Sequence, residues 1–108
     1  MKKSEVVLCE FYFSSFKKSK LRPVILYKDN LPFDDFIGIP ISSQIDNLKD
    51  DEFIITNSDF LDGEIPKDSK VIIRKPFAVS KGVIVKKYGT LDFKIFTKVQ
   101  DKFCEYFC

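Results

Sequence analysis

Residues 5–27, EVVLCEFYFSSFKKSKLRPVILY, contain two runs of strand-forming residues on either side of a basic segment. The first run, Glu5–Phe13, is rich in β-branched and aromatic residues and predicts a strand. The second run, Arg22–Tyr27, predicts another strand with Pro23 near its start, because proline lacks the N–H that a strand interior needs. The intervening residues, Ser14–Leu21, are expected to form a basic loop.

The rest of the chain predicts further short strands and one helix. The apolar runs that predict strands are Phe36–Gln44, Asp51–Asn57, Lys70–Val79 and Gly82–Gly89, and a long turn region, Asn57–Ser69, separates the middle two. Pro40 argues for a bulge or an edge position within its run. From Ile95 onward, apolar residues recur at three- and four-residue spacing, which predicts an amphipathic helix capped by Thr90 or Asp92. We therefore expect a mainly β domain spanning residues 1–108, a small, strongly curved barrel partly covered by a C-terminal helix.

Charge is segregated along the chain, although the totals of 18 Lys and Arg against 16 Asp and Glu nearly balance. Residues 1–30 hold seven basic and three acidic residues, residues 31–64 hold one and nine, and residues 65–108 hold ten and four. If the two basic parts fold together, one face could hold a polyanion, whereas an ordinary solvated surface is the alternative. Histidine is absent, which excludes the usual acid-base side chain and the commonest metal ligand.

The three cysteines, Cys9, Cys104 and Cys108, show neither CxxC nor Cys/His spacing, so we expect reduced thiols and no zinc site. The apolar run near the N-terminus is too short for a signal peptide or a membrane span. These features lead us to expect a cytoplasmic protein.

Three stretches together resemble the MazF/PemK toxins of type II toxin-antitoxin systems. They are SEVVLCEFYFSSFKKSKLRPVILY (4–27), DFIGIPISSQ (35–44) and KDSKVIIRKPFAVSKGVIVKKYGTLD (67–92). The likeness lies in the order and spacing of an Arg-Pro entry into an aliphatic strand, a hydroxyl pair ending a later strand, and a Gly-x-Leu-like step into the last helix. The resemblance implies an SH3-like barrel, usually a homodimer, that cleaves single-stranded RNA without a metal or other cofactor and is silenced by a cognate antitoxin.

By the same resemblance, Arg22 matches the catalytic arginine of the family and Ser42 matches its catalytic threonine or serine. An arginine suits this role because its planar fork can bond two phosphate oxygens as their charge grows in the transition state. The Ser42 hydroxyl would position the phosphate by hydrogen bonding. The alternatives are a salt bridge at the surface for Arg22 and a local backbone contact for Ser42.

Further side chains are candidates for binding the substrate. They are Phe16, Lys17, Lys18, Lys20, Ser43, Gln44 and Arg74. The cations would attract phosphates and Phe16 would stack on a base, whereas solvated lysines and a core phenylalanine are the alternatives. The group that takes the 2′ proton is not evident; Glu10 is one candidate, and an ordinary outward carboxylate is its alternative reading.

Two other functions remain open on the same fold. One is a non-catalytic inhibitor resembling the CcdB-like gyrase poisons, although these act through a C-terminal tryptophan and this chain ends CEYFC. The other is a nucleic-acid-binding or partner-binding barrel without nuclease activity, in which the basic segments matter and Ser42 does not.

Overall fold

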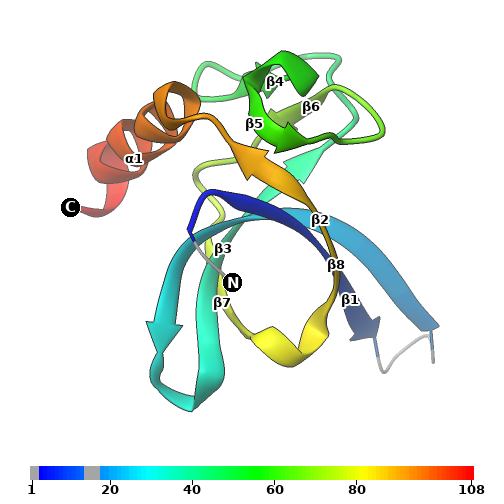
Figure 1. Cartoon of the computed structure of the whole chain (residues 1–108). Helices are drawn as coiled ribbons and strands as arrows, with labels where there is room; N and C mark the ends of the chain where they lie inside the picture. Colours follow the sequence, from blue (N-terminus) through cyan, green and yellow to red (C-terminus); the bar gives the residue numbers. More distant parts are fainter. Residues whose placement is uncertain (1–2, 14–17) are drawn as a thin grey trace.

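The chain forms a strongly curled antiparallel sheet, a half-barrel, followed by one helix at its C-terminal end (Figure 1). The computed structural model describes residues 3–13 and 18–108. The strands are β1 (Glu5–Phe13), β2 (Lys18–Leu31), β3 (Asp35–Ser42), β4 (Phe53–Ile55), β5 (Phe60–Gly63), β6 (Ser69–Val71), β7 (Phe77–Ser80) and β8 (Ile84–Leu91), and the helix is α1 (Phe93–Phe107). The expected class, mainly β with a C-terminal helix, is confirmed.

The strands are ordered β4-β6-β3-β2-β1-β8-β5, and β7 also pairs with β3. Along one side, β3 pairs first with β7 over residues 35–38 and then with β6 over residues 41–42. Pro40 lies between these two stretches, and its carbonyl accepts a hydrogen bond from the Ile72 amide at 3.0 Å. The N–H and the C=O of one strand residue point to the same side of the strand. The position of the N–H that Pro40 lacks therefore faces the point at which the partner of β3 changes from β7 to β6. Pro40 therefore lies within an interior strand rather than at an edge.

Strand β2 is longer than the sequence predicts. It begins at Lys18, so residues 18–21 continue the strand and are not part of a loop. These residues pair with β1 as an exposed two-stranded ribbon, in which Lys18 lies opposite Phe13 and Leu21 lies opposite Glu10. The basic composition predicted a loop, but a ribbon that faces water tolerates charged residues in a strand. Pro23 consequently lies inside β2.

Two apolar clusters occupy the two faces of the curled sheet, as the alternation along β2 requires. Ile25 belongs to the larger cluster, whereas Val24 and Leu26 belong to the smaller one. The helix α1 packs on the larger cluster through Phe96 and Val99, which are 4% and 0% exposed. The expected helix is thus confirmed.

One contact caps the start of α1, and another packs its second half on the sheet. The Asp92 side chain accepts a hydrogen bond from the Lys94 amide at 2.8 Å, so Asp92, and not Thr90, is the N-cap. Near the other end, the ring of Phe103 stacks on Tyr27 of β2 with 4.2 Å between the centroids. These contacts orient the helix against one side of the half-barrel (Figure 1).

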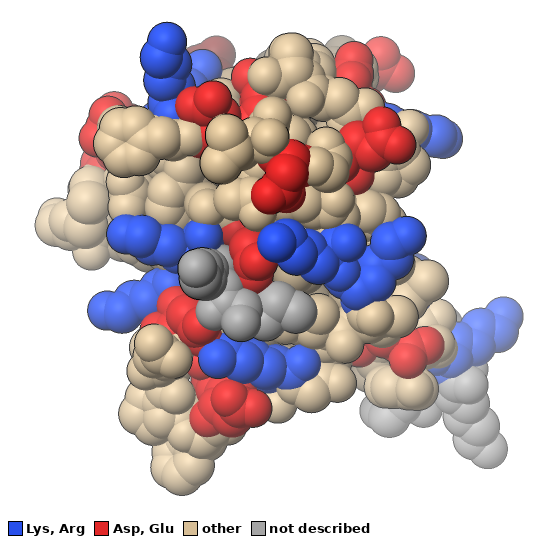
Figure 2. All heavy atoms as spheres, viewed as in Figure 1, with Lys and Arg blue, Asp and Glu red and all other residues tan. Residues whose placement is uncertain are grey.

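Basic and acidic side chains are mixed on the face shown in Figure 2. Lys and Arg gather across the middle of this face, with Asp and Glu above, below and among them. This face is therefore not uniformly positive, and a binding site for an anion has to be sought in the local arrangement of individual cations. Among the described residues, no helix is both long and apolar enough to cross a membrane.

Candidate active site

A cavity of about 670 Å³ lies where β2 and β3 separate, and we call it the fork cavity. The ladder between the two strands ends at the pair Val24 and Pro40. Beyond this pair, β2 continues as the ribbon with β1, while β3 turns to pair with β6 (Figure 1). Residues 21–23 of β2 and residues 40–44 at the end of β3 form two of the cavity walls.

Arg22 and Ser42 both line the fork cavity. Arg22 lies two residues before Val24, and Ser42 lies two residues after Pro40, so the two side chains share one face of the sheet. If the ladder continued past Val24 and Pro40, Arg22 and Ser42 would stand directly opposite each other. The separation of the strands instead opens a space between a guanidinium and a hydroxyl.

The Arg22 guanidinium is available to an anionic ligand. Arg22 is exposed, and no described carboxylate forms an ion pair with it. The alternative reading of Arg22 as a member of a surface salt bridge is therefore not supported among residues 3–13 and 18–108. A free guanidinium beside a cavity is suited to bind the oxygens of a phosphate.

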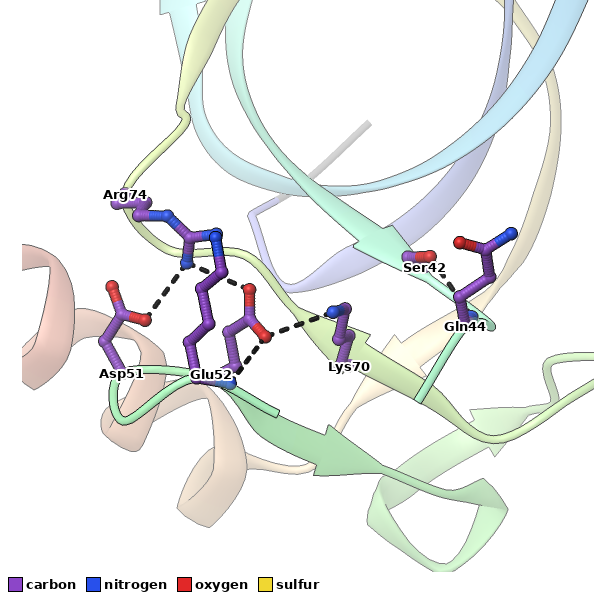
Figure 3. A network of polar contacts seen from close by, with 7 residues as sticks. Ser42, Gln44, Asp51, Glu52, Lys70 and Arg74 are labelled. Carbon is purple, nitrogen blue, oxygen red and sulfur yellow. Dashed lines mark hydrogen bonds and ion pairs between the residues drawn. The ribbon is translucent and has the colours of Figure 1, made fainter. Parts of the chain in front are cut away.

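The Ser42 hydroxyl already has one defined partner. Its Oγ accepts a hydrogen bond from the backbone N–H of Gln44 at 3.2 Å (Figure 3). Because a hydroxyl carries one O–H donor besides its acceptor lone pairs, this contact leaves the O–H to donate to a ligand. The turn after β3 also brings Ser43 and Gln44 to the cavity wall.

The remaining walls of the fork cavity come from segments in which no site residue was predicted from the sequence. Leu8, Ile65, Lys67 and Tyr88 are among these lining residues, and they add a cation and a phenol. Their sequence context offered no signal beyond ordinary strand and loop composition. None of the described residues that line the cavity is a carboxylate.

Glu10, the candidate general base, lines neither of the described cavities. Its carboxylate accepts hydrogen bonds from the hydroxyls of Tyr12 at 3.0 Å and Ser19 at 2.9 Å, on the exposed ribbon of β1 and β2. This arrangement is that of an outward-facing carboxylate and does not favour a catalytic role.

The other predicted substrate-binding residues are distributed unevenly. Phe16 and Lys17 lie outside the described residues. Lys18 and Lys20 are exposed on the ribbon and do not line the fork cavity, so their attraction of phosphates remains a prediction. Arg74 does not line the fork cavity either, and its guanidinium forms ion pairs with Asp51 and Glu52.

Arg74 belongs to a group of charged residues that we call the Glu52 cluster, consisting of Asp51, Glu52, Lys70 and Arg74 (Figure 3). Arg74 Nη1 lies 3.0 Å from Asp51 Oδ1 and 2.9 Å from Glu52 Oε2. Lys70 Nζ lies 3.1 Å from Glu52 Oε1, and the Lys49 amide donates to the same oxygen at 3.0 Å. Lys70 is the residue that pairs with Ser42 across β3 and β6, so this cluster adjoins the end of β3.

The Glu52 carboxylate is buried, with 1% of its side chain exposed, and yet it is ionised at neutral pH. The hydrogen bond from the Lys49 amide, aided by Lys70 and Arg74, outweighs burial and lowers the pKa of Glu52 to about 2. The neighbouring Asp51 accepts a hydrogen bond from the Tyr106 hydroxyl at 3.0 Å. The cluster therefore joins the segment that follows β3 to β6 and to α1.

A thiol near the site is chemically inert. Cys9 pairs with Arg22 across β1 and β2, but its side chain is fully buried in the smaller apolar cluster. Burial raises the pKa of the Cys9 thiol to about 11, so the nucleophilic thiolate is scarcely populated at neutral pH. Cys9 is therefore not a candidate nucleophile.

A strongly curled half-barrel with one C-terminal helix is consistent with the MazF-type fold. Residues 2–107 match the family model described as the PemK-like, MazF-like toxins of type II toxin-antitoxin systems, and the chain belongs to this family. The resemblance drawn from the sequence is thereby confirmed, and the family implies an antitoxin as partner. Comparison with curated proteins finds no match.

Proposed function

We propose that this toxin is a metal-independent endoribonuclease that cuts single-stranded RNA at a phosphate bound in the fork cavity. The observation that carries the proposal is that the exposed Arg22 and the hydroxyl-bearing Ser42 line the same cavity, with no described carboxylate paired to the arginine. RNA supplies its own nucleophile, so positioning and charge stabilisation are the main contributions required of the protein.

In the proposed reaction, the 2′-oxygen attacks the adjacent phosphorus as its proton leaves, and the bond from phosphorus to the 5′-oxygen breaks. The products are a 2′,3′-cyclic phosphate and a 5′-hydroxyl that has gained a proton. Arg22 stabilises the negative charge that accumulates on the non-bridging oxygens of the phosphorane. Ser42 donates its O–H to one of these oxygens while its Oγ accepts from Gln44, which fixes the direction of the hydroxyl.

The assembly that we propose is a homodimer, as the family resemblance implies, and its RNA substrate and antitoxin are its two macromolecular partners. An antitoxin that covers the fork cavity would silence the enzyme by excluding RNA from Arg22. Sedimentation analysis of the purified protein tests the dimer, and competition between RNA and antitoxin for the protein tests the overlap of the two sites.

The decisive experiment is cleavage of a single-stranded RNA by the purified protein in the presence of EDTA. We expect cyclic phosphate ends, and we expect DNA of the same sequence to stay intact because it lacks the 2′-hydroxyl. Arg22→Ala should lower the cleavage rate about 100- to 1000-fold, the usual effect of losing one donor to the developing charge. Lys75→Ala is the matched control, since it removes an exposed cation that lines neither cavity.

Circular dichroism establishes that each variant is folded. If folded Arg22→Ala cleaves as fast as the wild type, the arginine has no role in the reaction. If the wild-type protein cuts no RNA, the proposed activity is wrong.

A further inference from the structure

A second, smaller cavity of about 270 Å³ adjoins the fork cavity, and we call it the apolar cavity. The two cavities share Arg22, Pro23, Pro40 and Ile41, so they adjoin each other at the end of the fork. Among the described residues that line both cavities, Arg22 is the only charged one. A phosphate held by its guanidinium would therefore border both cavities.

The two cavities differ in the groups that they offer to a ligand. The apolar cavity is lined by Phe11, Val24 and Phe77 in addition to the shared residues, and among its described lining residues Arg22 has the only polar side chain. The rings of Phe11 and Phe77 pack edge to face with 5.7 Å between their centroids, and both are half-buried, so part of each ring remains accessible. This cavity offers aromatic and aliphatic surface but no second hydrogen-bonding side chain.

The fork cavity, by contrast, has several hydrogen-bonding side chains beyond the reacting pair. They are Ser43, Gln44, Lys67, Ser69 and Tyr88. The Gln44 carboxamide has both donors and an acceptor, which is the combination needed to distinguish the edges of nucleobases. In Figure 3, this carboxamide extends from the turn after β3, away from the Glu52 cluster.

We propose that the toxin reads RNA sequence on one side only of the phosphate at Arg22: hydrogen bonds in the fork cavity select the base, whereas the apolar cavity accepts any base. This inference rests on the proposed nuclease function. Its physical reason is that every base has an apolar face that can stack on an aromatic ring, so stacking contributes affinity without discrimination. Selection between bases needs donors and acceptors aimed at their edges, because a base that leaves those groups unpaired binds less well.

The experiment is cleavage of an RNA library with a randomised region, followed by sequencing of the products on both sides of each cut. For the wild type, we expect strong base preference on one side of the cut and little on the other. Phe77→Leu removes the ring but keeps apolar bulk, and it should raise KM about 10-fold on all sequences without changing the preferred bases. Phe11→Leu is a second variant with the same expectation.

Gln44→Ala and Lys67→Ala test the fork cavity, and at least one of them should weaken the base preference on the selective side. Phe93→Leu is the matched control for the ring deletions, because Phe93 is 81% exposed at the start of α1 and lines neither cavity. Equal preference on both sides, a changed preference in the Phe77 and Phe11 variants, or an unchanged preference in both fork-cavity variants would overturn the inference. Absence of any cleavage by the wild type would instead overturn the proposed function.

Discussion

Glu52→Gln tests whether a buried carboxylate stabilises the segment that follows β3. The folded protein lowers the pKa of Glu52 from 4.5 to about 2, which corresponds to about 3 kcal/mol of stability at neutral pH. Glutamine keeps the shape but cannot form ion pairs with Lys70 and Arg74, which lie within 3.1 and 2.9 Å of the carboxylate. We expect the free energy of unfolding at pH 7 to fall by about 3 kcal/mol.

The stability that the Glu52 carboxylate contributes should decrease as the pH falls. A carboxyl group whose pKa is lower in the folded state contributes its full stabilisation above the unfolded pKa of 4.5 and loses it as the pH falls towards 2. By pH 3.5, about 1.4 kcal/mol of the contribution should already be lost from the wild type. The difference in stability between wild type and Glu52→Gln should therefore narrow by this amount between pH 7 and pH 3.5.

Urea unfolding followed by circular dichroism at the two pH values measures both quantities. Asp50→Asn is the matched control, because it removes an exposed carboxylate from the same segment and should change stability by at most about 0.5 kcal/mol. A loss of less than about 1 kcal/mol for Glu52→Gln at pH 7, or a difference that is the same at both pH values, would refute the reasoning.

Two further predictions concern a close approach of strands and the reactivity of thiols. Gly63 has φ +73°, and a Cβ at this position would clash with the Tyr88 carbonyl oxygen. Gly63→Ala should therefore lower the free energy of unfolding, measured in urea, by at least about 1 kcal/mol. An unchanged unfolding midpoint would contradict this. Cys104 and Cys108 are exposed, whereas Cys9 is buried and burial raises its pKa to about 11. A thiol reagent at pH 8 should therefore modify two of the three cysteines in the native protein and all three in urea. Fast reaction of a third thiol in the native protein would show that Cys9 is accessible.

Local patterns predicted most of the strands and the helix. The β-branched and aromatic residues of β1 and the three- and four-residue spacing of apolar residues in α1 are features of a few consecutive residues, so they could be recognised in the sequence. The extension of β2 to Lys18 escaped prediction because exposed lysines are compatible with either a loop or a strand that faces water. Pairing with β1 decides between them, and that pairing involves residues on the other side of the intervening segment.

The contacts of Arg74 likewise could not be predicted from local sequence patterns. Its match to a position of the toxin family favoured contact with the substrate, yet its guanidinium contacts Asp51, 23 residues away in the sequence, and Glu52. No spacing rule connects these positions, because their proximity depends on the loop that brings β4 against β6. Tyr88 and Lys67 were missed for a related reason, since a residue becomes part of a cavity wall only when distant segments assemble around it.

The sequence by itself determined most of the strands, the C-terminal helix and the family resemblance, because each depends on residue type and spacing along the chain. The folded structure alone decided that β2 and β3 separate after Val24 and Pro40, that a cavity opens beside Arg22 and Ser42, and that Arg74 is held by carboxylates. The physical reason is that hydrogen-bond register, burial and ion pairing are properties of segments brought together in space. Their energies depend on distances that no local pattern of residues contains.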